Sequence, residues 1–168
     1  IAIVNISISP INDAPVSIDL TGNVEEDLQF SGSLTASDID GDDLTYSIVN
    51  NPENGTVTVD DVSLGSFTYI PNTNFNGADS FTFQSTDSEL VSNNAIVTIT
   101  ISPVNDEPIA SSINISTLED NNYNGGLSGS DIDGDDLSFS IVDAPANGTL
   151  TIVNNSEGVF TYSPEENY

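Results

Sequence analysis

Apolar and polar residues alternate along most of the chain with a period of two, which is the spacing of strands that bury one face. In the clearest stretch, Val97, Ile99 and Ile101 alternate with Thr98 and Thr100. The alternating stretches are short and rich in β-branched and aromatic residues, and Asn-Gly and Leu-Gly pairs typical of turns separate them. No stretch of useful length has the 3.6-residue period of a helix, so the pattern predicts an all-β fold.

Seven strands are predicted in one full unit of this pattern. They span residues 16–20, 28–36, 43–49, 55–60, 65–70, 79–86 and 94–102. Seven short strands separated by turn signals are typical of an antiparallel β-sandwich with Greek-key connections. We therefore expect tandem seven-stranded antiparallel Greek-key β-sandwiches, the second of them incomplete.

The expectation of a tandem arrangement comes from a repeat with a period of 93 residues and no gap. When residues 2–75 are aligned with residues 95–168, 37 of the 74 positions are identical. Tyr69 coincides with Tyr162, for example, and Phe75 with Tyr168. Such self-similarity indicates an array in which each unit has the same fold.

The register of the repeat divides the chain into three parts. Residues 1–13 are expected to be the last strand and the linker of a preceding repeat, residues 14–106 a complete repeat, and residues 107–168 a truncated second repeat. The second repeat lacks counterparts of the last two predicted strands. Either a longer array continues past residue 168, or another copy supplies those strands. Residues 1–8 could donate only the last strand, which favours the longer array.

Charge sets the limits on partners. The chain has 27 Asp and Glu residues and no Lys, Arg or His, so its formal net charge is −27. Nothing is available to neutralise phosphate, which excludes nucleic acid and disfavours anionic membrane surfaces. Solubility or a saline medium explains part of this charge but not why the acids cluster. The chain also has no Cys and no apolar run long enough to span a membrane.

The strongest acidic cluster is an Asp-Ile-Asp-Gly-Asp-Asp loop that occurs twice, at residues 38–43 and 131–136. Each copy gathers four carboxylates around one glycine, which permits a sharp turn. A hard divalent cation with oxygen ligands would relieve their repulsion, and Ca²⁺ is the first candidate. An EF-hand is not expected, because strands rather than helices flank the loop. A solvated acidic turn is the simpler alternative, and recurrence at the same register argues against it.

Further acidic residues and the linkers are weaker signals on their own. Glu26-Asp27 and its counterpart Glu119-Asp120 precede predicted strands, and Asp87 ends another. The linkers carry Asn12-Asp13 and Asn105-Asp106 between two prolines. Because proline fixes its own φ and keeps the preceding residue extended, both linkers are expected to be short and stiff.

Taken in order, these motifs resemble the cadherin repeat, and more closely the cadherin-like tandem repeats of large bacterial surface proteins. A cadherin repeat carries an early Glu, an Ala-x-Asp-x-Asp loop before a Tyr-Ser-Ile-type strand, an Ala-x-Asp at the end of a later strand, and an Asx-Asn-Asp-x-x-Pro linker. Glu26, residues 36–40, residues 85–87 and residues 104–108 stand in those places, with Ser85 where the family has Ala. The resemblance implies a cadherin/Ig-like sandwich and Ca²⁺ between successive repeats.

The resemblance also implies the calcium ligands. The first junction would use Asn12, Asp13, Asp38, Asp40, Asp42 and Asp87. The second would use Glu26, Asp27, Asn105, Asp106, Asp131, Asp133 and Asp135, while Glu119 and Asp120 would face a third. The family's Leu-Asp-Arg-Glu stretch has no counterpart, because residues 71–74 read Pro-Asn-Thr-Asn at about that place. One or two ions per junction are therefore expected rather than three.

Catalysis is not expected. The chain has no His or Cys for a catalytic triad or a zinc site. A glycosidase needs two acids across a sugar cleft, one of them with a raised pKa, and exposed acids on short turns give no reason for such a shift.

The function expected from these features is that of a structural, calcium-rigidified repeat of an extracellular stalk or adhesin, at the cell surface or secreted. Its partners would be neighbouring repeats, other copies of itself, or a surface glycan or protein. Two alternatives stay open. A calcium-dependent carbohydrate- or protein-binding module would need exposed aromatic residues near a loop, for which Phe30 and Tyr123 are the candidates. A subunit of an extracellular filament joined by strand exchange would account for the incomplete second repeat.

Overall fold

The computed structural model describes residues 3–167, and within that range all regular secondary structure is β-strand. The prediction of an all-β fold is confirmed. Two compact units, Ile1–Val104 and Asn105–Tyr168, make up the chain, and each is described by itself. Ile1, Ala2 and Tyr168 lie outside the described residues, as do the parts that fall on them of the repeat alignment and of the predicted last strand of a preceding repeat, in residues 1–13.

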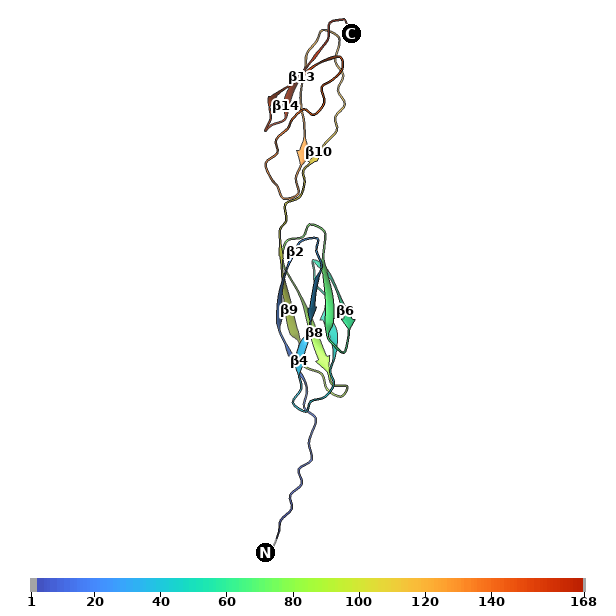
Figure 1. The fold of residues 1–168 in the computed structure, drawn as a ribbon, viewed down its shortest axis with the longest axis vertical. Coiled ribbons are helices and arrows are strands. Elements are labelled where there is room, and N and C mark those ends of the chain that lie inside the picture. The colour runs from blue at the N-terminus through green and yellow to red at the C-terminus, as the bar shows by residue number, and fades with distance from the viewer. Residues whose placement is uncertain (1–2, 168) are drawn as a thin grey trace. The chain divides into compact units, whose positions relative to one another are not determined.

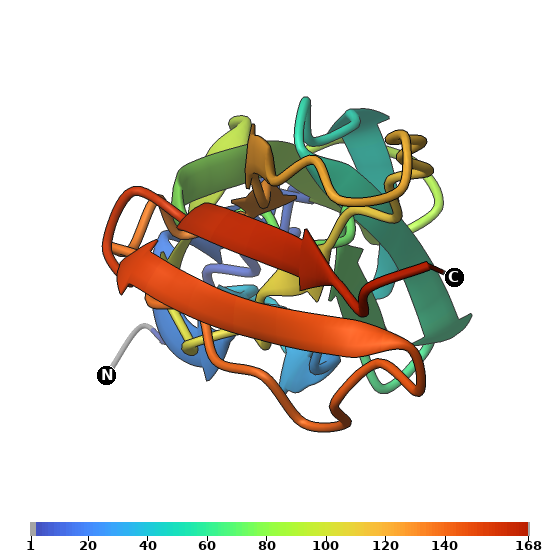
Figure 2. The same cartoon turned by 90° about the horizontal axis from the view of Figure 1, so that it is seen from above.

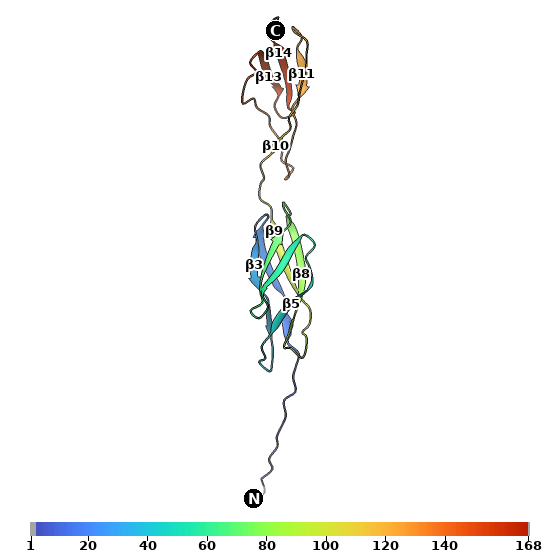
Figure 3. The same ribbon diagram turned by 90° about the vertical axis from the view of Figure 1, so that its right-hand side faces the viewer.

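The first unit is a β-sandwich (Figures 1 and 3). Its strands are β1 (Val16–Ile18), β2 (Leu20–Glu25), β3 (Phe30–Ser33), β4 (Thr35–Ser37), β5 (Thr45–Asn50), β6 (Gly55–Asp61), β7 (Ser66–Pro71), β8 (Gly77–Thr86) and β9 (Ala95–Ser102). One sheet has the order β2-β9-β8-β5 and the other the order β3-β7-β6, while β1 pairs with β4. The unit thus has the two layers that its alternating pattern predicts.

The core lies between the two sheets. Phe67 and Tyr69 of β7 face it from one side, and Phe81 and Phe83 of β8 face it from the other, each with 1% or less of its surface exposed. The Phe67 and Phe81 rings meet edge to face, with centroids 5.3 Å apart, across the two layers. Alternation along β7 and β8 therefore supplies the apolar faces whose burial drives the packing.

The strand boundaries differ from the prediction in one region. The predicted strand at 16–20 divides into β1 and the start of β2, and residues 21–25 form the rest of β2. The predicted strand at 28–36 divides into β3 and β4. β2 pairs in parallel with β9, so the first unit is not purely antiparallel. Gly22 explains why the pattern missed this strand, because a Cβ there would lie 2.4 Å from the Phe30 ring. Glycine is unfavourable inside a strand, but packing against Phe30 requires it at this position.

Within its described residues, 105–167, the second unit has five strands. They are β10 (Ile109–Ala110), β11 (Tyr123–Gly126), β12 (Gly129–Ser130), β13 (Gly148–Asn154) and β14 (Val159–Pro164). β10 pairs with β12, and the other three form a sheet of order β11-β14-β13, whose β13–β14 hairpin stands out in Figure 2 in orange-red and red. A register shift between Ile152 and Asn154 repeats the one between Val59 and Asp61 in the first unit. The assignment of residues 107–168 to a truncated cadherin-like repeat stays a prediction.

The core of the second unit is less complete than that of the first. Phe160 is buried, but Leu127 and Tyr162 keep intermediate exposure, whereas their counterparts Leu34 and Tyr69 are fully buried. In the first unit, β8 and β9 complete the core, and their counterparts in the 93-residue register would fall beyond residue 168.

Candidate metal site

The acidic loop of the first unit curls around one carboxylate oxygen. Asp38 Oδ1 accepts hydrogen bonds from the backbone N–H groups of Asp40 at 2.8 Å and Gly41 at 3.1 Å. The N–H of Asp42 lies 3.5 Å from the same oxygen. Gly41 has φ +82°, a conformation that glycine adopts without steric cost. The spacing of Asp and Gly therefore produces a tight turn that carries its carboxylates on one short stretch of backbone.

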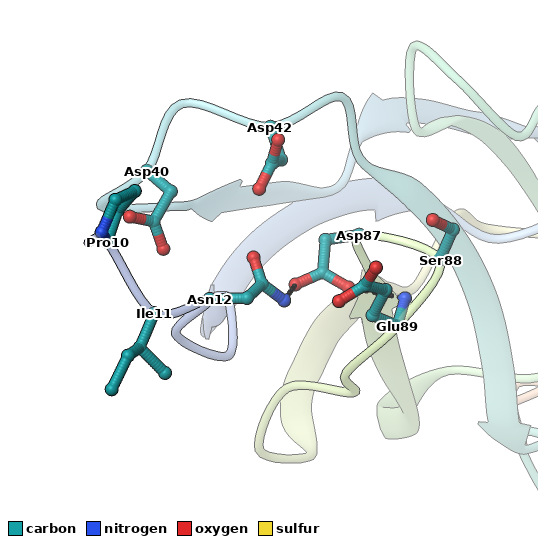
Figure 4. A pocket seen from close by; sticks show the side chains of 8 residues that line it. All are labelled: Pro10, Ile11, Asn12, Asp40, Asp42, Asp87, Ser88 and Glu89. Atoms are coloured by element: carbon teal, nitrogen blue, oxygen red, sulfur yellow. Dashed lines mark hydrogen bonds between the residues drawn. The ribbon is translucent and has the colours of Figure 1, made fainter.

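The linker before β1 is hydrogen-bonded to this loop and to the end of β8. The N–H of Asp13 donates to Asp40 Oδ2 at 2.8 Å, and the side-chain amide of Asn12 donates to Asp87 Oδ2 at 2.9 Å. In Figure 4 the side chains of Asn12, Asp40, Asp42 and Asp87 point into a common space. The hollow there has a volume of about 450 Å³ and is lined by Pro10, Ile11, Asn12, Asp40, Asp42, Asp87, Ser88 and Glu89.

A cation fits this arrangement. Asp38, Asp40 and Asp42 each offer a carboxylate oxygen, and the three oxygens lie within 4.8 Å of one another. Asp38 Oδ2 is buried, and among the described residues no donor reaches it. A buried carboxylate oxygen without a donor is costly unless a cation compensates its charge. The donor set consists of oxygens only, which is the set that Ca²⁺ prefers.

The electrostatics of the loop also favour a cation. Desolvation by the surrounding loop raises the pKa of the exposed Asp42, and the negative charges of Asp38, Asp40 and then Asp87 raise it further. The pKa of Asp87 is lowered instead, chiefly because its carboxylate accepts the N–H of Leu90, with smaller contributions from the N–H of Glu89 and the amide of Asn12. These fixed donors favour the ionised form of Asp87, and its negative charge in turn raises the pKa of Asp42.

The second unit repeats the loop and its link to the linker. Asp131 Oδ1 accepts the N–H groups of Asp133 at 2.9 Å and Asp135 at 3.3 Å. Gly134 has φ +80°, which matches Gly41. The N–H of Asp106 donates to Asp133 Oδ2 at 2.7 Å, as Asp13 does to Asp40. The two loops therefore have the same local geometry because they have the same sequence.

A hollow of about 310 Å³ lies beside this second loop. It is lined by Asn105, Pro108, Ile109, Ala110, Gly129, Asp131, Asp135, Asp136, Leu137, Ser138 and Phe139. The predicted ligands Asn105, Asp131 and Asp135 thus share one cavity. The counterpart of Asp87 in the 93-residue register would fall beyond residue 168.

The remaining predicted ligands have different surroundings. Glu26 is buried, and its Oε1 accepts the N–H of Val104 at 2.5 Å in the next linker. Asp27 has φ +61°, and its carboxylate accepts the N–H of Asn74 at 3.0 Å, so this side chain stabilises a turn. Glu119 is exposed, and Asp120 repeats the positive φ of Asp27. In the first unit the structure thus gathers Asn12 with Asp38, Asp40, Asp42 and Asp87, and Asp13 contributes its backbone.

Sequence reasoning missed one buried acid, Asp79 of β8. Its carboxylate accepts the Tyr69 hydroxyl at 2.8 Å and the N–H groups of Asn54 at 2.9 Å and Glu53 at 3.2 Å. Asp79 also accepts the N–H of Ser80. These donors compensate the buried charge, so Asp79 joins the two sheets and the turn before β6. Its position two residues before Phe81, on the inward face of a strand, was the only signal available.

The two aromatic residues named for a ligand-binding module pack into the sandwiches. The Phe30 and Phe67 rings have centroids 6.0 Å apart, and the Tyr123 and Phe160 rings are 6.1 Å apart. Both Phe30 and Tyr123 are half-buried. They therefore do not provide the exposed platform that this alternative needs.

Comparison with known proteins places this geometry in a family. Residues 12–103 match the sequence profile of the bacterial cadherin-like domain, and residues 105–168 match that of a bacterial Ig domain. The chain belongs to the bacterial cadherin-like family. The predicted resemblance is confirmed. Domains of these two families are typically non-enzymatic structural modules of extracellular proteins.

Individual relatives agree with this assignment. The integrin beta-like protein E of Dictyostelium discoideum is 32% identical over 167 residues, a match that covers 86% of this cadherin-like chain but 9% of that protein. Human protocadherin-24 EC1-2 has a TM-score of 0.59 at 17% identity, covering 93% of this chain and 80% of that one. Cadherin domains 3–6 of protocadherin gamma B2 have a TM-score of 0.55 at 18% identity, covering 90% of this chain and 39% of that one. These structures share the fold.

A search of the described residues for a helix long and apolar enough to cross a membrane finds none.

Proposed function

We propose that this cadherin-like chain is a calcium-stiffened repeat of an extracellular stalk or adhesin. The observation that carries the proposal is the buried Asp38 Oδ2, which has no donor among the described residues and lies in a group of three carboxylates. The family match supports it, because cadherin-like domains generally bind Ca²⁺. The ion would supply positive charge that a chain without Lys, Arg or His lacks altogether.

In the first unit the ion would be held by residues from three segments. Asn12 and Asp13 belong to the linker, Asp38, Asp40 and Asp42 to the acidic loop, and Asp87 to the end of β8. In the second unit the corresponding ligands are Asn105, Asp106, Asp131, Asp133 and Asp135. In this proposal Glu26 and Asp27 are also calcium ligands, at the junction that follows their repeat. Glu119 and Asp120 would have the same role one repeat later.

Stiffening would follow from where these ligands lie along the chain. Hydrogen bonds from Asp13 and Asn12 already join the linker to the loop and to Asp87, directly after β8. A cation that neutralises the loop removes the repulsion between its carboxylates, which otherwise opposes this ordered arrangement. Because Ca²⁺ would bind the ordered arrangement in preference to the loose one, it would shift the population towards a stiff linker.

Calcium titration of matched variants tests the site. Isothermal titration calorimetry and thermal unfolding of the full chain should show saturable Ca²⁺ binding and a higher Tm in Ca²⁺ than in EDTA. At 100 times Kd the stabilisation would be about 2.7 kcal/mol. Asp38→Asn should weaken binding at the first site. Asp60→Asn makes the same charge change at an exposed residue bonded to Thr68, and it should bind like the parent.

Two results would contradict the proposal. One is an equal loss of Ca²⁺ affinity in the Asp38→Asn and Asp60→Asn variants, which would mean that only the overall charge matters. The other is a Tm increase that NaCl of equal ionic strength reproduces, because screening rather than a site would then explain it.

A further inference from the structure

Three serine hydroxyls of the first unit meet between β1, the end of β8 and the segment before β9. Ser17 Oγ lies 2.9 Å from Ser85 Oγ and 2.9 Å from Ser92 Oγ. Ser17 is 4% exposed and Ser85 is fully buried. Ser92 Oγ donates to the Asn93 carbonyl at 2.7 Å and accepts the N–H of Ser85 at 2.9 Å. None of these residues is a predicted calcium ligand.

The direction of these hydrogen bonds follows from the number of protons. Each hydroxyl has one proton to donate. Ser92 donates its proton to the Asn93 carbonyl, so Ser17 is the donor in its bond to Ser92. The proton of Ser17 is then in use, so Ser85 donates to Ser17. Ser17 is therefore the residue that joins β1 to the other two serines.

The side chain of Asn93 holds the backbone of Ser17 as well. The N–H of Ser17 donates to Asn93 Oδ1 at 3.1 Å, and Asn93 Nδ2 donates to the Ser17 carbonyl at 3.2 Å. The Asn93 amide thus bonds both backbone groups of Ser17, as a neighbouring strand would. We call Ser17, Ser85, Ser92 and Asn93 the serine clamp.

One end of the serine clamp leads to Asp87. Ser85 is two residues before Asp87 in the chain, and the Ser85 carbonyl accepts the N–H of Ser92 at 2.9 Å. Between them, Asp87 Oδ1 accepts the N–H of Leu90 at 2.7 Å, which closes the turn. The position of the Asp87 carboxylate is therefore tied to that of the two serines.

The other end of the serine clamp leads to the linker. Pro15 is buried; its ring fixes its own φ and keeps Ala14 extended. Little backbone freedom therefore remains between Ser17 and Asp13. One residue earlier, the amide of Asn12 donates to Asp87 (Figure 4). The serine clamp thus lies between the two segments that this bond joins.

Pairing of β1 with β4 does not depend on the Ser17 hydroxyl. Ala110 stands at the position of Ser17 in the 93-residue register. With Ala110, β10 still pairs with β12 in the register in which β1 pairs with β4. The Ser17 hydroxyl is therefore available for another role, which is its contact with Ser85 and Ser92.

We propose that the serine clamp positions the first metal site by holding Asn12 and Asp13 against Asp87 before a cation binds. This inference rests on the proposed calcium function, and the four members of the clamp are positioning residues, not ligands. Ligands that are already held together lose less conformational freedom on binding, so the site binds more tightly. Removing the link at Ser17 should loosen the linker without calcium and weaken calcium binding at the first loop.

Amide hydrogen exchange in EDTA tests the serine clamp without metal. Ser17→Ala should speed exchange of the Asp13 N–H roughly fivefold, as expected for the loss of one hydrogen bond. Ser33→Ala is the matched control, because it removes a hydroxyl bond to the Leu64 carbonyl instead. Equal exchange of Asp13 in the parent and Ser17→Ala chains, or equal acceleration by Ser33→Ala, would overturn the proposal.

Ser85→Ala separates the link from the burial of hydroxyls in general. The Ser17–Ser92 bond does not need Ser85, so Ser85→Ala should leave exchange of the Asp13 N–H at the parent rate. An acceleration as large as that in Ser17→Ala would overturn the proposal.

Calcium titration followed by NMR measures the two loops separately, through the amide signals of Gly41 and Gly134. Ser17→Ala should raise the calcium Kd at Gly41 roughly fivefold, by the same loss of one hydrogen bond, and leave the Kd at Gly134 unchanged. An unchanged Kd at Gly41 would overturn the positioning role and leave the calcium function standing. A parent chain whose Gly41 signal does not saturate with Ca²⁺ would overturn the calcium function itself, and the positioning role with it.

Discussion

The backbone N–H of Asp13 donates a 2.8 Å hydrogen bond to the carboxylate of Asp40, 27 residues along the chain. Asp106 and Asp133 repeat it at 2.7 Å. The bond joins a linker residue to the acidic loop that the linker precedes. Asp40 therefore has two roles that substitution can separate, as hydrogen-bond acceptor and as bearer of negative charge.

Asp40→Ala and Asp40→Asn should differ in EDTA. Asp40→Ala removes the acceptor and should lower the free energy of unfolding by about 0.5–1.5 kcal/mol. Asp40→Asn keeps an acceptor oxygen and removes one of the repelling charges, so it should be neutral or slightly stabilising. Both should reduce the stabilisation by Ca²⁺. Urea denaturation in EDTA and in Ca²⁺ measures these effects, and equal destabilisation by both variants in EDTA would show that the hydrogen bond is not the relevant contact.

The linker between Pro103 and Pro108 should be protected by calcium. A protease that cleaves beside Asp or Glu should cut near Asp106 or Glu107 faster in EDTA than in Ca²⁺, because the ion would restrain the backbone there. Asp131→Asn with Asp133→Asn should lose this protection while the first unit stays folded by circular dichroism. Small-angle scattering on the same samples should show a narrower distribution of dimensions in Ca²⁺. Profiles and cleavage rates that do not change with Ca²⁺ would contradict the stiffening mechanism.

Tyr69 should respond to alkaline pH differently from the other tyrosines. Burial and the hydrogen bond to Asp79 raise its pKa above the ordinary value for tyrosine of about 10. The raised pKa means that protonated Tyr69 stabilises the fold; this contribution is complete below about pH 10 and is lost as pH rises through the folded-state pKa. Ultraviolet titration should show one of the five tyrosines ionising last, together with unfolding. Tyr69→Phe should remove that last step.

The same substitution has a consequence at neutral pH. Tyr69→Phe leaves the buried Asp79 carboxylate with one donor fewer and should cost about 1–3 kcal/mol of unfolding free energy. Tyr162→Phe is the matched control in the second unit, because the Tyr162 hydroxyl donates to the Asn147 carbonyl rather than to a carboxylate. Its smaller expected effect is measurable by chemical denaturation. A larger loss in Tyr162→Phe would contradict the role given to Asp79.

Gly22→Ala should destabilise the first unit by overpacking. The added Cβ would lie 2.4 Å from Phe30 Cζ, so the ring must move, at a cost of about 1–3 kcal/mol. Gly126→Ala, where a Cβ would meet nothing within 4 Å, controls for the intrinsic effect of the exchange. Phe30→Leu should recover part of the loss in the double variant. Equal effects of the two glycine substitutions on Tm would show that the Phe30 contact is not responsible.

The sequence predicted most of the fold because burial on one face imposes a period of two on each strand. β5 to β9 lie close to where this alternation predicts them. β2 was missed because its inward positions include Gly22, whose missing side chain makes room for Phe30. Its parallel pairing with β9 joins segments far apart in the chain, and no local pattern encodes such a pairing.

The site was predictable to a similar degree. The Asp-x-Asp-Gly pattern and its recurrence after 93 residues pointed to Asp38, Asp40 and Asp42 as a group. The sequence did not show that Asp27 bonds to the turn at Asn74, or that Asp79 is buried with Tyr69 as its donor. Each of those outcomes depends on which backbone N–H groups the other strands bring within reach.

By itself, the sequence determined the all-β class, the period of the repeat and the two acidic loops, because alternation, turn residues and clustered charge are local and recur in one register. Only the tertiary structure decided that one oxygen of Asp38 is occupied by the loop's own N–H groups while the other is buried without a donor. That distinction depends on the burial of individual atoms and on hydrogen bonds in space. It turns a run of carboxylates into a candidate site that a cation fits.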